Sequence, residues 1–201
     1  CDKYGILLIF DEVITGWGRT GEPFAAQAFG VTPDIITMAK GITNGVMPLG
    51  AVASREKIYD TILDASPTGA VEFFHGYTYS AIPPSIAAGL AMQDIIEKEN
   101  LIQRSKDMSP YFLDGLFSLK DIDIITDIRG YGMLGGIDIR FDERPGKAGY
   151  TCFKKLFEAG LSLKATGDCL IVAPPFICER EHIDEIIEKL RIGITNYMKS
   201  K

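Results

Sequence analysis

The chain has 201 residues, of which 46% are hydrophobic and 24% are charged, as in an ordinary globular protein with room for one large domain or two small ones. The net charge is −6 at pH 7 and no basic cluster is present, which argues against nucleic-acid binding. No apolar run approaches the roughly 18 residues that a membrane-spanning helix needs, so no membrane partner is expected.

The four cysteines are scattered and form no CxxC pair, and no signal peptide is visible. Reduced thiols in a cytoplasmic protein are therefore expected, and no metal site is predicted. The first residue is not Met, and a strand pattern begins by residue 5. We therefore expect that the chain either has lost an N-terminal portion or is half of a larger protein.

Strand and helix patterns alternate over the first part of the chain. A continuous apolar run at residues 6–10 is typical of a parallel strand that is covered on both faces. We expect Ser54 to cap a short helix in which Ile58 and Ile62 face inward. The predicted strands are 6–10, 35–38 and 50–53, the predicted helices are 25–29, 85–100 and 101–119 with an interruption near Pro110, and the long loops are 11–34 and 64–84.

The hydrophobic period changes in the second part of the chain. Alternation at residues 122–128 and 136–141 predicts strands with one exposed face, and it places Ile137 and Ile139 on the same side. Short strands are predicted at 161–163 and 170–172, after a helix at 151–159 that Gly160 ends. A C-terminal helix is predicted from the apolar stripe of Ile183, Ile186, Ile187, Leu190, Ile194 and Tyr197.

These elements predict an α/β protein with two domains. Residues 1–105 have the pattern of the later part of a mostly parallel α/β domain, and residues 106–201 have that of a small α+β domain.

Two charged residues each follow a strand pattern, Asp11 after residues 6–10 and Lys40 after residues 35–38. Ligands of open α/β sheets bind at the carboxyl ends of strands, and neighbouring strands lie about 4.8 Å apart, so the two side chains can bracket one aromatic ring. An amine that forms an imine and a carboxylate that holds a pyridinium charge suit pyridoxal phosphate (PLP). The alternative is a solvent-facing lysine and an aspartate that serves a turn.

Five motifs, in family order, resemble class III PLP-dependent aminotransferases. They are residues 10–21 (FDEVITGWGRTG), 30–41 (GVTPDIITMAKG), 74–80 (FHGYTYS), 128–136 (IRGYGMLGG), and 167–168 (GD) followed by 173–175 (APP). The third motif is similar to the ω-amino acid:pyruvate (β-alanine:pyruvate) branch. The resemblance covers only the second half of a typical member. It implies the fold type I, aspartate aminotransferase-like architecture, with a partial large domain and a C-terminal α+β small domain.

The resemblance also implies a role for each matching residue. Lys40 matches the Schiff-base lysine and proton shuttle, Asp11 the carboxylate on the pyridine nitrogen, and Val13 a residue that packs on the ring. Thr78, assisted by the backbone near Tyr77, matches a hydroxyl that binds the cofactor phosphate of the partner subunit. The ordinary alternatives are a core valine and a loop hydroxyl.

Two positions depart from the family pattern. Lys164 stands where this branch usually has an arginine that grips the substrate carboxylate, so Lys164 is expected to bind carboxylate as a point charge, or else to be an exposed lysine. Residues 82–83 are Ile-Pro where His-Pro is common, which would alter the helix start beside the phosphate loop. Glu12 is expected to orient the surrounding loops, and Arg19 is expected to be structural.

The resemblance implies PLP-dependent transamination between an ω-amino acid or amine and a 2-oxo acid, with pyruvate as the acceptor, in a homodimer. Aminomutase or decarboxylase chemistry would use the same Asp11 and Lys40. A truncated, inactive domain that serves only as a fold or association partner is the other alternative, because the groups that the N-terminal half of a family member supplies are absent.

Overall fold

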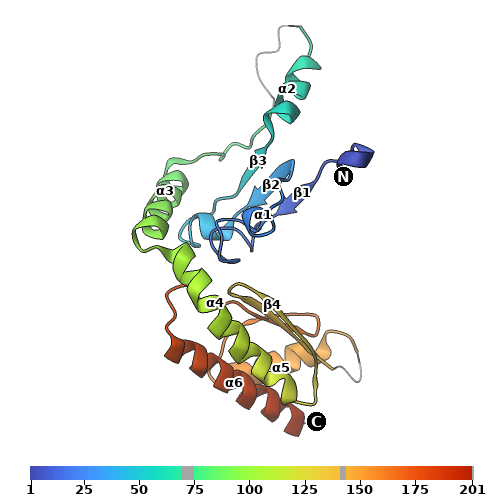
Figure 1. Ribbon diagram of the computed structural model, residues 1–201, viewed down its shortest axis with the longest axis vertical. Helices are drawn as coiled ribbons and strands as arrows, with labels where there is room; N and C mark the ends of the chain where they lie inside the picture. The colour runs from blue at the N-terminus through green and yellow to red at the C-terminus, as the bar shows by residue number, and fades with distance from the viewer. Residues whose placement is uncertain (69–74, 141–143, 201) are drawn as a thin grey trace. The chain divides into compact units, whose positions relative to one another are not determined.

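The structure is a computed structural model that describes residues 1–68, 75–140 and 144–200 (Figure 1). The chain forms two compact units, one of residues 1–18 with 22–100 and one of residues 19–21 with 101–201. The first unit therefore ends at Asn100. The sequence pattern placed the domain boundary five residues later, after residue 105. The short segment Arg19–Gly21 belongs to the second unit although its neighbours in the chain belong to the first.

The first unit contains a three-stranded sheet in the order β1 (Ile9–Asp11), β2 (Ile35–Met38), β3 (Ala51–Ser54). As predicted, β1 and β2 are parallel. β3 is antiparallel to β2, an orientation that the sequence did not indicate. β1 is shorter than the predicted strand, and Ile6 and Leu7 are 59% and 54% exposed. The expectation that both faces of this strand are covered is therefore wrong for the described part of this unit, because nothing there packs over these side chains.

The helices described in the first unit are α1 (Ala25–Ala28), α2 (Glu56–Asp64) and α3 (Pro83–Lys98), with 3₁₀ turns η1 (Asp2–Tyr4) and η2 (Lys40–Ile42). The prediction that Ser54 caps α2 is wrong, because Ser54 ends β3 and the N-cap residue is Arg55. Ile62 is 37% exposed, so its predicted inward position is also wrong. α3 begins at Pro83, whose fixed φ and missing N–H suit a first helical turn.

The second unit contains an antiparallel four-stranded sheet and its own helices. The strand order is β4 (Ile125–Tyr131), β5 (Leu134–Ile139), β7 (Cys169–Val172), β6 (Lys164–Thr166), and the helices are α4 (Leu101–Phe117), η3 (Ser118–Asp121), α5 (Lys147–Glu158) and α6 (Arg180–Lys199). α4 continues through Pro110, so the predicted interruption is wrong. The predicted strand at 161–163 is also wrong: β6 pairs with β7 only from Lys164, because Leu161 and Leu163 pack against the core instead.

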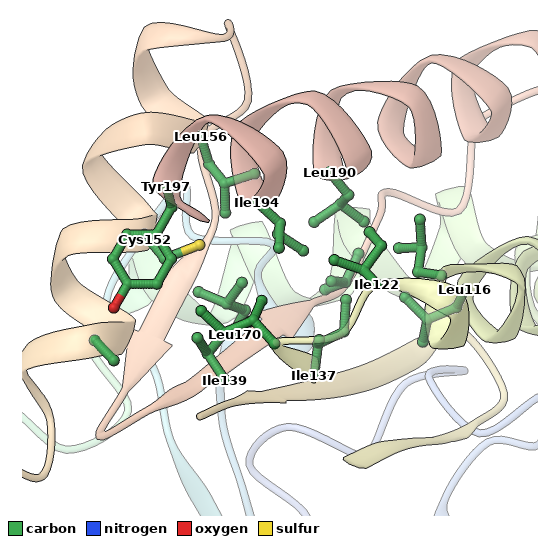
Figure 2. Close-up of a cluster of buried hydrophobic side chains, with 14 of the residues drawn as sticks. Leu116, Ile122, Ile137, Ile139, Cys152, Leu156, Leu170, Leu190, Ile194 and Tyr197 are labelled. Atoms are coloured by element: carbon green, nitrogen blue, oxygen red, sulfur yellow. The ribbon is translucent and has the colours of Figure 1, made fainter. Parts of the chain in front are cut away.

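The hydrophobic core lies in the second unit, where side chains of α4, α5 and α6 meet one face of the sheet (Figure 2). Ile137 and Ile139 of β5 are buried on the same face, which confirms the predicted alternation. The predicted stripe on α6 is also confirmed, because Ile183, Leu190 and Ile194 are fully buried. The buried apolar residues described in the first unit are Ala25, Ala26 and Ile96. The second unit therefore has the larger apolar core.

Glycines allow the β4–β5 hairpin to lie close against α4 and the Arg19 segment. A Cβ at Gly130 would lie 2.5 Å from Leu113 Cδ2, and one at Gly135 would clash with Leu116. Gly132 has φ of 60°, and its missing side chain leaves room for the backbone of Arg19. The glycines of the predicted motif at 128–136 thus serve close packing and a turn in the second unit.

Gly193 of α6 lies against Leu156 of α5, where an added Cβ would meet Leu156 Cδ2 at 2.5 Å and Leu156 Cα at 2.9 Å. We expect Gly193→Ala to lower the free energy of unfolding of the second unit by about 1–3 kcal/mol, because overpacking outweighs the better helix propensity of alanine. Urea denaturation followed by far-ultraviolet circular dichroism measures the change. The matched control is Asn196→Ala on the exposed side of α6. A stabilised Gly193→Ala protein would contradict the packing.

Candidate active site

The parallel pair β1–β2 places Asp11 and Lys40 at one edge of the first sheet. Asp11 is the last residue of β1 and lies opposite Thr37 of β2. The backbone N–H of Glu12 donates to the carbonyl of Thr37 at 2.9 Å, which extends the pairing by one residue. Lys40 begins the η2 turn directly after β2. Both side chains therefore follow the carboxyl ends of neighbouring parallel strands, where open α/β sheets bind ligands.

Lys40 has an unusual backbone conformation, with φ of 45° in the left-handed region that favours glycine. The turn is closed by two backbone hydrogen bonds, from Ile42 to Ala39 at 3.2 Å and from Thr43 to Lys40 at 3.2 Å. The Thr43 hydroxyl donates to the carbonyl of Met47 at 2.6 Å. The exposed Lys40 amine has no hydrogen-bond or ion-pair partner among the described residues. The amine is thus accessible while the backbone that carries it is fixed by the turn.

The Asp11 carboxylate is exposed and makes one local hydrogen bond. Its Oδ1 accepts the backbone N–H of Val13 at 3.1 Å. Val13, two residues further along the chain, is half-buried and lies in the long loop that follows β1. The carboxylate is therefore oriented by the loop and still accessible to a ligand.

Glu12 is buried at 1% exposure and organises the loop after β1. Its carboxylate accepts the backbone N–H groups of Ala25 and Ala26, both at 2.8 Å, and the hydroxyl of Thr15 at 2.6 Å. A buried carboxylate is tolerated where several donors satisfy it. The expectation that Glu12 orients the surrounding loops is confirmed.

Arg19 is a structural residue of the second unit, as expected. Its guanidinium donates to the carbonyls of Met133 at 2.9 Å and Pro174 at 2.6 Å, and it lies 4.4 Å from the ring centroid of Phe176. Burial lowers the pKa of Arg19 to about 10, so it remains charged at neutral pH. All of these contacts join the Arg19–Gly21 segment to the second unit.

The predicted phosphate loop lies in the first unit, and its residue Phe74 is outside the described residues. Tyr77 and Thr78 are exposed. The loop forms a turn in which Tyr77 N donates to Ser80 Oγ at 2.9 Å, and Ser80 N donates to the carbonyl of Tyr77 at 2.9 Å. The N-cap of α3 is Ile82, and it offers no side-chain cap. Thr78 is therefore an exposed residue a few positions before the start of α3.

Lys164 is exposed at the start of β6 in the second unit, opposite Ile171 of β7. The hairpin that carries it is joined to α5 through Asp168, a residue to which sequence reasoning assigned no role beyond the family motif. Asp168 Oδ2 accepts Gly146 N at 2.7 Å and its Oδ1 accepts Gly149 N at 3.0 Å. The family motif Gly-Asp thus fixes the first turn of a helix to the hairpin.

The described residues hold no group of three or more His, Cys, Asp or Glu side chains that could bind a metal ion. In the same part of the chain, no helix is both long enough and apolar enough to cross a membrane.

A model of the family described as "Aminotransferase class-III" matches residues 1–193. The chain belongs to this family. Members of the aminotransferase class-III family depend on PLP, so the motifs at Asp11 and Lys40 lie in a chain of PLP-dependent ancestry.

Similar proteins and structures agree with this assignment. The chain is 46% identical over 95% of its length to an ω-aminotransferase of Caulobacter vibrioides, and 44% identical over 94% to a β-alanine–pyruvate aminotransferase of Pseudomonas aeruginosa. It covers 44% and 42% of these proteins, so it spans less than half the length of the curated relatives it matches. An (S)-enantioselective ω-transaminase from Thermomicrobium roseum matches with a TM-score of 0.89 and 36% identity, over 98% of this chain and 45% of that one. The predicted α/β class of fold type I PLP-dependent transferases is confirmed, and the match covers part of the neighbour's fold.

The residues of this class III chain fit PLP by their chemistry. Among the described residues, the Lys40 amine has no partner and the Asp11 carboxylate accepts only a local backbone N–H, that of Val13. An amine and a carboxylate at neighbouring strand ends suit the aldehyde and the ring nitrogen of the cofactor. Both groups are therefore available to a ligand that needs one of each.

We expect Glu12→Gln to loosen the loop after β1. In the original protein the N–H groups of Ala25 and Ala26 each donate to one carboxylate oxygen, and glutamine would replace one of these oxygens with an NH₂ group that cannot accept. Amide hydrogen exchange in the peptide that contains Ala25 and Ala26 should become faster by about tenfold or more. Mass spectrometry of the exchanged peptides measures this. Glu56→Gln, in the exposed first turn of α2, is the matched control. Unchanged exchange at Ala25 and Ala26 would show that Glu12 does not hold this loop.

Proposed function

We propose that the whole protein transfers an amino group between an ω-amino acid or amine and a 2-oxo acid, with pyruvate as the acceptor. The observation that carries the proposal is the placement of Asp11 and Lys40 at the carboxyl ends of two parallel strands in a chain of the class III family. The relatives support the substrate class, because two of them are named a β-alanine–pyruvate and an ω-amino acid–pyruvate aminotransferase.

PLP, when bound, supplies an aldehyde that condenses with amines and a ring that withdraws electrons from the attached carbon. The Nζ atom of Lys40 would hold the cofactor aldehyde, and as a free amine it would move a proton at the substrate carbon. The exposed Asp11 carboxylate holds the proton on the ring nitrogen, because a nearby negative charge favours the protonated ring. The local turn at Lys40 keeps this amine at the sheet edge during both steps.

Three further residues have proposed roles in holding the cofactor. Val13 packs on one face of the ring, which its half-buried position beside Asp11 supports. Thr78 and the backbone at Tyr77 bind the cofactor phosphate of the partner subunit, which the outward position of this turn supports. Hydroxyl and N–H donors are the groups that satisfy a phosphate dianion.

We further propose that Lys164 binds the substrate carboxylate. The exposed position of Lys164 on a hairpin that Asp168 anchors supports this role. Lysine interacts as a point charge and not as a planar fork, so carboxylate binding should be weaker and less directional than with arginine.

The protein is proposed to be a cytoplasmic homodimer. Exposed apolar side chains in the first unit support association: Tyr4, Ile6, Leu7 and Ile9 are 72%, 59%, 54% and 56% exposed. Four cysteines that are all free suit a reducing compartment.

The proposed function is tested by adding PLP to the whole protein and recording its visible absorbance. We expect a bound-cofactor band that is absent in Lys40→Ala. Borohydride reduction should attach the cofactor to Lys40, which peptide mass spectrometry identifies. Adding β-alanine should bleach the band, and pyruvate should restore it. Asp11→Asn should retain cofactor but lose roughly a hundredfold or more in rate, because general acid–base and electrostatic groups contribute effects of this size.

The control for this experiment is Lys120→Ala, which removes an exposed lysine of the second unit. Cofactor attached to a lysine other than Lys40 would contradict the site. A band that β-alanine and 1-phenylethylamine both leave unchanged would contradict transamination and favour the inactive association domain.

The role of Lys164 is tested with two donors in single-turnover reactions without acceptor. Lys164→Ala should raise the half-saturating concentration of β-alanine by about tenfold to a hundredfold, since a hydrogen bond to a charged group contributes about 1.5–3 kcal/mol. The value for 1-phenylethylamine, which has no carboxylate, should stay within about twofold of the original. Lys164→Arg should lower the value for β-alanine. Equal changes for both donors would show that Lys164 does not bind the carboxylate.

A further inference from the structure

We propose that Trp17 is a positioning residue that holds the Lys40 turn and, with it, the left-handed backbone conformation of Lys40. Trp17 lies in the long loop after β1, inside the first family motif, and none of the roles argued above uses its side chain. The inference rests on the proposed function only in giving Lys40 its chemical role, because the contacts themselves belong to the protein without cofactor.

The first observation is the close approach of Trp17 to the residue that follows Lys40. A Cβ on Gly41 would lie 2.7 Å from both Cβ and Cδ1 of Trp17 and 2.9 Å from its Cγ. Real side chains essentially never approach that closely, so the indole occupies the space on this side of the turn. Gly41 is therefore glycine because the tryptophan packs directly on its backbone.

The second observation is that Trp17 and Lys40, the residue before Gly41, both have strained backbones. Lys40 has φ of 45° and Trp17 has φ of 64°, both in the region that L side chains rarely adopt. Such conformations persist only where the surroundings enforce them, and they cluster at functional sites. The contact between the Trp17 side chain and Gly41 joins the two strained positions.

The third observation is that the Trp17 backbone is itself fixed by the loop. Its N–H donates to the carbonyl of Pro23 at 2.7 Å, and its ring makes an edge contact with Phe24 at a centroid distance of 5.1 Å. Gly16 lies tightly between Glu12 and Phe24, where an added Cβ would be 2.9 Å from atoms of both residues. The buried carboxylate of Glu12 holds the following helix, α1, to the same loop. The tryptophan is thus a rigid support.

The surroundings of the indole nitrogen indicate whether Trp17 supports the turn by packing or by a hydrogen bond. Trp17 Nε1 is buried and has no hydrogen-bond partner among the described residues. The ring therefore acts on Gly41 by its shape and not by a polar contact. A phenylalanine, which keeps the ring atoms next to Cβ but lacks the N–H, should preserve most of this function.

The test compares Trp17→Ala with Trp17→Phe in the whole protein without cofactor. The amides of Ile42 and Thr43 close the Lys40 turn, so their hydrogen exchange reports its stability. We expect about tenfold faster exchange of this peptide in Trp17→Ala and a change within about threefold in Trp17→Phe. Tyr59→Ala, which truncates an exposed aromatic residue of α2, should leave it unchanged. Exchange in Trp17→Ala equal to that of the unchanged protein would overturn the proposal.

A reciprocal pair of variants approaches the same contact from the turn. Gly41→Ala places a methyl group against the indole and should also accelerate exchange at Ile42 and Thr43. Gly50→Ala is the matched control, because an added Cβ there meets its nearest atom at an ordinary 3.5 Å. If Trp17→Ala does not fold, Trp17→Leu with this pair decides the question. Unchanged exchange in both Trp17→Leu and Gly41→Ala would refute the role of the contact.

A second readout ties the support to the chemistry of Lys40. After PLP addition and borohydride reduction, the rate of cofactor attachment at Lys40 should fall about tenfold in Trp17→Ala and recover in Trp17→Phe, as expected for a loss of preorganisation. A loop residue with a merely structural role would change protein yield but not this rate per folded molecule. If cofactor attaches to Lys40 neither in the unchanged protein nor in any variant, the proposed function fails. The exchange comparison still decides the role of Trp17.

Discussion

The parallel pairing of β1 with β2 is the constraint on which the candidate site depends. The register places Asp11 opposite Thr37. The hydrogen bond from Glu12 N to the Thr37 carbonyl continues the pairing one residue beyond Asp11. Because both strands run in the same direction, the residues after them emerge at one edge of the sheet. A slip of one residue would turn the Asp11 side chain to the opposite face, so register and chemistry are inseparable.

Asp11 and Glu12, neighbours at the end of β1, have opposite environments. Asp11 is exposed and accessible to a ligand, whereas Glu12 is buried and satisfied by donors of α1 and the loop. Successive side chains of an extended backbone point to opposite sides, which permits this division. The same loop then carries Trp17 to Gly41, so the carboxylate that holds the loop also supports, indirectly, the turn that begins at Lys40.

Each unit is stabilised internally by a different kind of interaction. The second unit has a contiguous apolar core of helix and sheet side chains, and it holds the Arg19–Gly21 segment through backbone and guanidinium contacts. The first unit, as far as the structure describes it, relies more on hydrogen bonds, tight glycine contacts and short strands. Within three successive residues, Trp17, Gly18 and Arg19, the chain passes from a residue that contacts Gly41 to one that is anchored in the second unit.

Local patterns in the sequence determined the element types, the parallel pair with its two charged ends, the buried face of α6 and the family. These features were predictable because a period of two or 3.6 and a short motif are contained in adjacent residues. The contacts that shape the site were decided only by the tertiary structure: Glu12 with α1, Trp17 on Gly41, Asp168 on the start of α5, and Arg19 in the second unit. Each joins residues far apart in the chain, and no period or motif encodes which of them will meet. The length of β1 and the position of β6 were mispredicted for the same reason, since strand ends depend on what the neighbouring segments cover.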